Sequence, residues 1–240
     1  MPPLALTGER TLPDVPAENY WFRRHLAVYE WIAQRCERLE VVDLACGEGY
    51  GTAVLARRAL LATGVDANPE AHEHARLKYG GSRTRFVREL LETFAEPCDA
   101  VVFLQTIEHV ADPVAVLDHI RAMLRPGGTA YVSTPNLLRL APPGAEKSDN
   151  PWHLREYRAE EFRALCRSSA FGEVELLGVF HARGLRLHEL ALRVGWDRVH
   201  PRLGLTRPFY DRVVPAISAR DFTLRPRNLA RALDFLAVMR

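Results

Sequence analysis

The stretch D-L-A-C-G-E-G-Y-G-T, residues 43–52, follows directly on a short run of β-branched residues. Gly47 and Gly49 can adopt backbone angles that other residues resist, and they leave bare backbone for a ligand to approach. Asp66 ends the next apolar run, seventeen positions after Gly49. This spacing is typical of a carboxylate that binds both hydroxyls of a ribose in a nucleotide-binding α/β fold. The stretch therefore predicts a cofactor site between parallel strands.

Segments typical of strands and helices alternate outward from this turn. The expected strands are 40–45, 60–66, 85–88, 99–104 and 129–134, and the expected helices are 19–38, 52–58, one after Asn68-Pro69, and one from Asp112-Pro113 to Pro126-Gly127-Gly128. This alternation predicts parallel βαβ units with right-handed crossovers. Beyond residue 135 we expect a long loop over 136–150, a helix over 159–169, a strand over 173–180, helical segments over 185–220 and a closing strand over 235–239.

Length and composition indicate one domain. The chain has 240 residues, of which 48% are hydrophobic and 26% charged, as in ordinary globular proteins. We divide this single domain, 1–240, into an N-terminal arm and helix (1–38), a cofactor-binding half (40–135) and a substrate-side half (136–240). The third part contains the helical insertion at 185–220.

Charge and cysteine patterns exclude several classes of protein. The formal net charge is only +2 and the arginines are scattered, so no nucleic-acid partner is expected. The four cysteines form no C-x-x-C pair, which argues against a zinc ribbon or a redox motif. No signal peptide is recognisable and no apolar run approaches the roughly 20 residues of a membrane helix. We therefore expect a cytoplasmic protein with no membrane partner.

Two classes of cofactor compete for the turn. The dinucleotide fingerprint G-x-G-x-x-G places a pyrophosphate on a helix N-terminus. Here Thr52 stands where the third glycine belongs, and Asp43 would repel a pyrophosphate. S-adenosylmethionine (SAM) carries an ammonium and a sulfonium group, so it avoids this repulsion. The turn therefore favours SAM over NAD.

Five segments resemble the class I SAM-dependent methyltransferases in order and spacing, over about residues 40–180. Residues 43–49 resemble motif I, with Ala45 in place of its first glycine. Asp66 matches the ribose-binding acid and Glu89 the polar residue beside adenine. L-Q-T-I-E-H (104–109) and R-P-G-G-T-A-Y-V-S-T-P-N (125–136) resemble later segments. The resemblance implies a Rossmann-like three-layer sandwich whose mostly parallel sheet has an antiparallel last strand. It also implies SAM as cofactor, bound by Asp43, Ala45, Gly47, Gly49, Asp66, Ala67, Glu89, Leu90 and Gln105.

His153 is the sequence-based candidate for a general base, because it follows the long loop on the cofactor side of the sheet. A histidine with an ordinary pKa of about 6.5 can accept a hydroxyl proton at neutral pH. Glu156 stands three residues on and could orient the ring if this stretch is helical. In the alternative interpretation, His153 only ties the loop down through a hydrogen bond.

Glu108 and His109 form an acid–histidine pair. In ubiquinone-pathway O-methyltransferases, which this segment resembles, an E-x-x-E-H pattern is associated with magnesium. Gln105 replaces the first acid here, and two remaining ligands do not suit an oxygen-loving cation. We therefore predict no metal, and expect this pair to begin a helix and shape the floor of the pocket.

The block E-N-Y-W-F-R-R-H, residues 18–25, is unusually aromatic. In many related methyltransferases a similar block covers the cofactor, which implies that Arg23 or Arg24 binds the cofactor carboxylate. An amphipathic helix packed on the sheet would explain Trp21 and Phe22 equally well.

The whole pattern also resembles a narrower group of actinobacterial O-methyltransferases, some of which are linked to methylated polysaccharides. Segments L-T-G-E-R-T (6–11), 18–25, N-P-W-H-L-R-E (150–156) and F-H (180–181) carry this resemblance. It implies methyl transfer to a hydroxyl of a small molecule, with a sugar as one acceptor class. Transfer to nitrogen or carbon, a non-catalytic SAM-binding protein and an NAD-dependent oxidoreductase are the alternatives, and a homodimer is left open.

Overall fold

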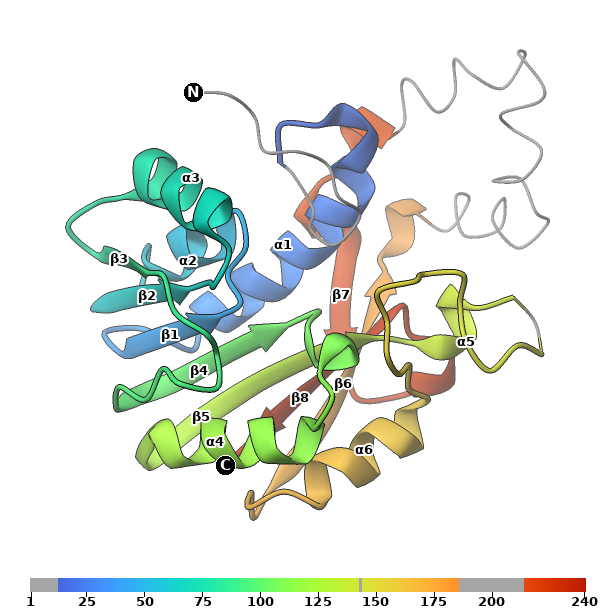
Figure 1. Cartoon of the computed structure of the whole chain (residues 1–240). Helices are drawn as coiled ribbons and strands as arrows, with labels where there is room; N and C mark the ends of the chain where they lie inside the picture. The colour runs from blue at the N-terminus through green and yellow to red at the C-terminus, as the bar shows by residue number, and fades with distance from the viewer. Residues whose placement is uncertain (1–12, 143, 186–213) are drawn as a thin grey trace.

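The computed structural model describes residues 13–142, 144–185 and 214–240. The eight strands of these residues form one sheet with helices on both faces (Figure 1). The strands are β1 (Glu40–Leu44), β2 (Leu61–Val65), β3 (Thr84–Val87), β4 (Cys98–Leu104), β5 (Leu124–Pro135), β6 (Val174–His181), β7 (Phe222–Arg225) and β8 (Asp234–Met239). The helices are α1 (Asn19–Ala33), α2 (Tyr50–Leu55), α3 (Pro69–Tyr79), α4 (Pro113–Met123), α5 (Leu137–Leu140) and α6 (Ala159–Arg167). Short 3-10 helices are η1 (Pro16–Glu18), η2 (Ile107–His109), η3 (Arg183–Leu185), η6 (Ala219–Asp221) and η7 (Leu229–Arg231).

The strand order is β3-β2-β1-β4-β5-β8-β6-β7. The first five strands in this order pair in parallel; in β1, Val42 lies opposite Thr63 of β2 and Val101 of β4. From β1 the successive strands β2 and β3 are added on one side and β4 and β5 on the other, so the strand order reverses between β1 and β4. In open parallel sheets, ligands bind beyond the carboxyl ends of the strands at such a switch point, which places the expected site after β1 and β4.

The other three strands add an antiparallel section. β8 lies between β5 and β6 and is antiparallel to both, so the expected antiparallel last strand is confirmed. β7 pairs with β6 at the edge and was not expected. Its four residues F-T-L-R alternate apolar and polar side chains, so a period-two signal was present but was not used.

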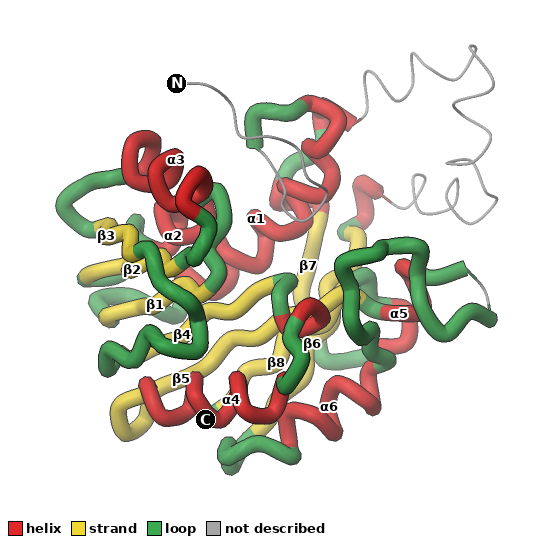
Figure 2. Tube along the Cα trace, viewed as in Figure 1, coloured by secondary structure: helices red, strands yellow, loops and turns green. Residues whose placement is uncertain are grey.

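Helices cover both faces, which gives the expected three layers (Figure 2). One face packs against α1 and α2, and the other against α4 and α6. Val41 and Val42 in β1 point to opposite faces, as neighbouring residues of a strand must. The apolar stripe of α1 lies in the first core, where Leu26 and Ile32 are buried.

Several boundaries differ from the sequence-based expectation. α1 ends at Ala33 rather than at residue 38, because the chain turns and Arg38 adopts a left-handed φ of 62° before β1. β5 begins at Leu124, before the Pro126-Gly127-Gly128 turn, since Leu124 already pairs with Cys98. The expected loop 136–150 contains α5, whose first turn is capped by Asn136.

Parts of the expected organisation lie outside the described residues. These are residues 1–12 of the N-terminal arm and 186–213 of the helical insertion; Ala219 and Arg220, at the end of that insertion, lie in the 3-10 helix η6. The division of 1–240 into three parts therefore stays a prediction. Within the described ranges, no helix is both long and apolar enough to cross a membrane.

Candidate active site

The turn after β1 has the backbone conformation that its glycines predict. Gly47 and Gly49 have φ angles of 55° and 91°, and Ala45 also lies in the left-handed region at 55°. A Cβ atom on Gly49 would lie 2.6 Å from Cβ of Ala75, so α3 packs directly on this backbone. A left-handed alanine is disfavoured by about 1–2 kcal/mol. Ala45 nevertheless adopts this conformation, so the turn has the expected backbone course without its first glycine.

Asp66 follows β2 and is tied to the turn. One carboxylate oxygen accepts the N–H of Gly47 at 2.8 Å, and the other accepts the N–H of Asn68 at 2.9 Å. Backbone donors thus fix the carboxylate while its flank faces a cavity. This is the position that the sequence predicted for a ribose-binding acid.

Asp43 lies beneath the turn and is fully buried. Its carboxyl accepts hydrogen bonds from the Tyr29 hydroxyl at 3.1 Å and the Thr52 hydroxyl at 2.7 Å. Burial raises the pKa of Asp43 to about 7, against the effect of these two bonds. Asp43 is not among the residues that line the cavity, so it supports the turn from below.

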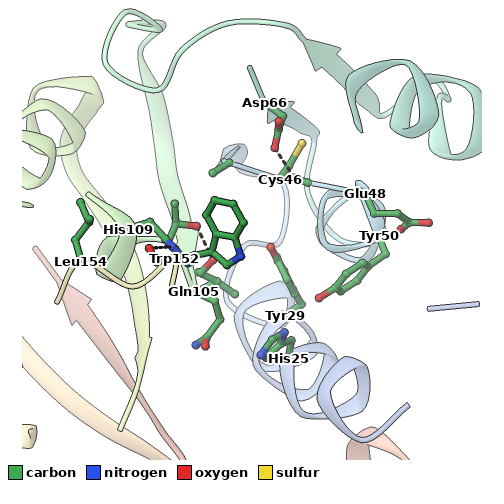
Figure 3. A pocket seen from close by; sticks show the side chains of 14 residues that line it. His25, Tyr29, Cys46, Glu48, Tyr50, Asp66, Gln105, His109, Trp152 and Leu154 are labelled. Atoms are coloured by element: carbon green, nitrogen blue, oxygen red, sulfur yellow. Dashed lines mark hydrogen bonds between the residues drawn. The ribbon is translucent and has the colours of Figure 1, made fainter. Parts of the chain in front are cut away.

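A cavity of about 450 Å³ opens at the switch point (Figure 3). Its lining includes four of the residues that the sequence predicted for the cofactor: Ala45, Gly47, Asp66 and Gln105. The remaining lining residues are His25, Tyr29, Cys46, Glu48, Tyr50, Leu104, Thr106, His109, Trp152 and Leu154. The site thus combines the ends of β1, β2 and β4 with α1, α2 and the loop before α6.

The predicted adenine-side residues lie outside this lining. Ala67 is exposed, Glu89 is half-buried, and Leu90 is 57% exposed. Ala67 follows Asp66 directly, and Glu89 and Leu90 follow β3, the strand beside β2. Their predicted contact with the cofactor stays a prediction.

Helix α1 contributes side chains that the sequence analysis missed. His25 and Tyr29 lie one turn apart and both line the cavity, and Tyr50 of α2 packs edge-on against Tyr29. The signal was present as the four-residue spacing of His25 and Tyr29 on an amphipathic helix. Burial lowers the pKa of His25 to about 4.

Neither arginine of the aromatic block lines the cavity. Arg23 donates to the Asn19 side chain at 3.0 Å, and its guanidinium lies over the Phe22 ring. Arg24 is buried in an ion pair with Asp234 of β8 and is therefore not available to a ligand. A role for Arg23 at the cofactor carboxylate stays a prediction.

Glu48 was also missed, although it lies in the middle of the motif. Its buried carboxylate is surrounded by three partners on α3: His74 at 2.9 Å, Lys78 at 2.7 Å and the Tyr79 hydroxyl at 2.8 Å. These bonds fasten the turn to α3. Sequence gave no signal for them, because the partners stand 26 to 31 positions away.

His153 and Glu156 contact each other, although the stretch that holds them is not helical, which was the condition of the prediction. The His153 Nδ1 lies 2.7 Å from a Glu156 carboxylate oxygen, and both side chains are buried. Burial acts to raise the pKa of Glu156, but hydrogen bonds from Ser148 and His153 outweigh it and lower the pKa. His153 does not line the cavity; the neighbouring Trp152 and Leu154 do.

His109 lines the cavity in front of His153. The two rings meet edge-on, with centroids 4.9 Å apart. The His109 Nδ1 lies 2.9 Å from the carbonyl oxygen of Trp152, as Figure 3 shows. Glu108 and His109 lie in the 3-10 helix η2, but of the two only His109 lines the cavity.

Glu108, His109 and His153 each bring one potential ligand atom to within 4.8 Å of the others. The sequence had supplied only the first two. Burial raises the pKa of Glu108 to about 8, and its carboxyl accepts the Thr134 hydroxyl at 3.0 Å. One carboxylate with two imidazoles is a poor ligand set for a hard, oxygen-loving cation. The absence of a metal stays our prediction.

The glycine turn at a switch point, the acid after β2 and the cavity between them are features that class I SAM-dependent methyltransferases share. Comparison of the sequence with protein families agrees with the geometry. The chain belongs to the methyltransferase domain family, whose model matches residues 18–190. It is an enzyme of this class and uses SAM as its cofactor.

Curated relatives and solved structures are consistent with this family. A probable SAM-dependent methyltransferase of Mycolicibacterium smegmatis is 37% identical, covering 98% of this chain and 94% of that protein. A ubiquinone biosynthesis O-methyltransferase of Xylella fastidiosa is 36% identical over 40% of this chain and 42% of its own length. The structure of a SAM-dependent methyltransferase from Thermotoga maritima, described as a possible histamine N-methyltransferase, has a TM-score of 0.61, 17% identity and 92% coverage of both chains. At this identity, the last likeness shows the fold alone.

Proposed function

We propose that this enzyme transfers the methyl group of SAM to a hydroxyl of a small molecule, and that the acceptor is a sugar. The observation that carries the proposal is the composition of the cavity wall. Asp66 lies on one side, and His109, Trp152 and Leu154 lie on the other. A cofactor bound to Asp66 would present its methyl group toward an imidazole and a half-exposed indole.

For the cofactor, each residue is proposed for the part of the molecule it could reach. Asp66 holds the ribose, and Ala67, Glu89 and Leu90 lie along the adenine side. The turn with Ala45, Gly47 and Gly49, supported by Asp43, holds the methionine side together with Gln105 and Arg23. The bound cofactor supplies the electrophilic methyl group, so the protein has to align the acceptor, exclude water and remove a proton.

Hydroxyl rather than amine acceptors are favoured by the charges around the cavity. An ammonium acceptor is attracted by an unpaired carboxylate. Of the two carboxylates that line the described cavity, Glu48 is paired with Lys78 of α3 and Asp66 is assigned here to the ribose, so neither is left for an ammonium. A hydroxyl needs a base instead, and the histidines of this wall, with His153 and Glu156 behind it, supply one.

Three further features support the proposed acceptor: the first and third favour a sugar, and the second favours a hydroxyl. The indole of Trp152 is 50% exposed and lines the cavity, where a pyranose ring could stack on it. The relative from Xylella fastidiosa is named an O-methyltransferase. The sequence also resembles actinobacterial enzymes linked to methylated polysaccharides. Transfer to nitrogen or carbon, or SAM binding without catalysis, are the alternatives.

The proposal is tested in two stages. Calorimetric titration with SAM, and with NAD as the control, should show SAM binding on the order of micromolar and no NAD binding. Radiolabelled SAM is then supplied with a panel of monosaccharides, methyl glycosides, phenols and amines. Label in a sugar ether supports the proposal. Label confined to amines, or no transfer to any acceptor of the panel by SAM-binding protein, would contradict it.

A further inference from the structure

We propose that the side chains of Trp152 and Leu154 form the platform on which the acceptor binds, and that His153 and Glu156 are positioning residues that hold this platform in place. The inference rests on the proposed function, because it names the residues that select the acceptor of that site. It follows from which side chains of residues 152–154 face the cavity, how their backbone is fixed, and how the ring of His153 is engaged.

The side chains of residues 152–154 alternate between the cavity and the interior. Trp152 and Leu154 both line the cavity and are exposed, whereas His153 between them is buried. In Figure 3 the indole of Trp152 extends into the cavity from its loop. Large apolar side chains that stay exposed in the wall of a cavity are typical of ligand-binding sites. The alternation therefore presents two apolar side chains to whatever binds on this side.

The backbone of this segment is fixed to its own loop and to the 3-10 helix η2. The N–H of Trp152 donates to the side-chain oxygen of Asn150 at 3.0 Å, and its carbonyl oxygen lies 2.9 Å from Nδ1 of His109. The N–H of Leu154 donates to the carbonyl oxygen of Glu108 at 2.9 Å. Because η2 follows β4, these bonds attach the platform to the end of a central strand.

The ring of His153 has both nitrogens engaged within the loop. An amide nitrogen can only donate, so Asn150 donates to Nε2 at 3.0 Å, and Nδ1 lies 2.7 Å from a carboxylate oxygen of Glu156. Glu156 also accepts the N–H of Ser148 at 2.8 Å and the hydroxyl of the same residue. These contacts match the loop-tying interpretation of His153. An acceptor in the cavity meets the side chains on either side of this ring.

The network contributes preorganisation to acceptor binding. A loop that is already ordered loses little conformational freedom when the acceptor binds, so more of the contact energy appears as affinity. The indole of Trp152 offers a flat apolar face on which the C–H groups of a sugar ring can lie. Leu154 adds a second apolar contact in the same wall. We therefore expect acceptors with a ring to be preferred over open-chain polyols that carry the same hydroxyls.

The first test needs no acceptor. Amide hydrogen exchange reports the hydrogen bonds of the Trp152 and Leu154 N–H groups, and in His153→Gln and Glu156→Gln these amides should exchange about 10-fold faster than in wild type. His119→Gln is the control, since His119 also contacts a backbone carbonyl, that of Phe94, but lies on α4. Exchange that is unchanged in both loop variants would overturn the positioning roles.

Calorimetry with SAM separates the platform from the cofactor part of the cavity. We place SAM on the side of Asp66, so Trp152→Ala should bind SAM with an affinity equal to wild type. Trp152 is exposed, and this variant is expected to fold even if His153→Gln does not. Loss of SAM binding in Trp152→Ala would assign the indole to the cofactor and overturn the platform.

The second test uses the hydroxyl acceptor that the wild-type enzyme methylates. Trp152→Ala should raise the acceptor KM by about 10-fold with little change in kcat, and Trp152→Phe should restore part of the loss because its ring keeps a flat face. His153→Gln should also raise KM more than it lowers kcat. An unchanged KM in Trp152→Ala would overturn the platform. A fall in kcat at constant KM in His153→Gln would make that residue catalytic and overturn its positioning role.

A matched pair of leucines controls for the loss of exposed apolar surface. Leu154 and Leu60 are 61% and 60% exposed, but Leu60 precedes β2 and does not line the cavity. Leu154→Ala should raise KM by about 3-fold and Leu60→Ala should not; equal KM values would remove Leu154 from the platform. Equal kcat/KM for the preferred sugar and its open-chain alditol would contradict the role of the indole. Failure of the wild type to methylate any hydroxyl contradicts the proposed function instead, while exchange and calorimetry still decide the placement of these residues.

Discussion

Arg24 of α1 forms a buried ion pair with Asp234 of β8, although 210 positions separate them in the sequence. Arg24 also donates to the backbone oxygen of Leu233 at 3.0 Å. Helix α1 carries His25 and Tyr29 into the cavity. The pair therefore holds the helix that covers the site against the antiparallel section of the sheet.

Removal of one partner of this pair should destabilise the protein strongly. In Arg24→Leu the Asp234 carboxylate remains buried without a counter-charge, and we expect a loss of about 3–5 kcal/mol in the free energy of unfolding. Urea denaturation measures it. The double variant Arg24→Leu/Asp234→Leu should recover most of that loss, because no isolated charge is left. If the single and double variants are equally unstable, packing rather than charge explains the effect.

Asp66→Asn should weaken SAM binding with little change in the fold. The asparagine side chain has one acceptor oxygen, so it cannot accept both the Gly47 and the Asn68 N–H groups and also bind ribose hydroxyls. Hydrogen bonds to a charged group contribute about 1.5–3 kcal/mol each, so we expect the Kd to rise by about 10- to 100-fold in calorimetry. Glu73→Gln is the control, because Glu73 is an exposed carboxylate on α3. Equal affinity in Asp66→Asn and wild type would remove Asp66 from the cofactor site.

Glu108 predicts a specific dependence of stability on pH. Burial raises its pKa from 4.5 in the unfolded chain to about 8 in the folded one. Below pH 4.5 both states are protonated and there is no penalty; between pH 4.5 and 8 the unfolded state ionises first, so stability falls as the pH rises. The slope from this group is at most about 1.4 kcal/mol per pH unit.

Glu108→Gln isolates this contribution, because the amide can still accept the Thr134 hydroxyl. Urea denaturation at pH 5, 6, 7 and 8 should show the variant gaining stability relative to wild type as the pH rises. A constant difference across this range would mean that Glu108 ionises normally in the folded protein.

Chelation should leave the enzyme active. One carboxylate beside two histidines is a poor ligand set for a hard cation, so dialysis against EDTA should not change kcat with the sugar acceptor. Loss of activity that magnesium restores would show that Glu108, His109 and His153 hold a cation, and the prediction of no metal would then be wrong.

The cofactor half of the site could be predicted from sequence because its determinants are local. All of them lie within 27 residues, positions 40–66: the apolar strand, the glycines of the turn that follows it, and Asp66. The turn and Asp66 each follow a strand, and the βαβ pattern fixes the direction of both strands. The structure places the turn and Asp66 at the cavity as expected. Glu48 also lies there, but its role depends on partners in α3 that no local pattern reveals.

The acceptor half could not be predicted in the same way. The sequence favours His153 because of the loop it follows, whereas the residue that faces the cavity is His109. The placement of both histidines depends on contacts that no local pattern reveals, such as that between His109 and Trp152, 43 positions apart. The edge strand β7 was also missed: F-T-L-R alternates apolar and polar side chains, but its pairing with β6 is long-range.

The central place of β8 in the sheet has a consequence for biosynthesis. Residues 234–239 pair with β5 on one side and β6 on the other. Each of those strands therefore lacks one of its two neighbours until this segment has left the ribosome. A nascent chain that ends before Asp234 can form the parallel half but would expose two unpaired strand edges, which favour aggregation. The antiparallel half, and with it the anchor of α1, can therefore be completed only after translation of the last strand.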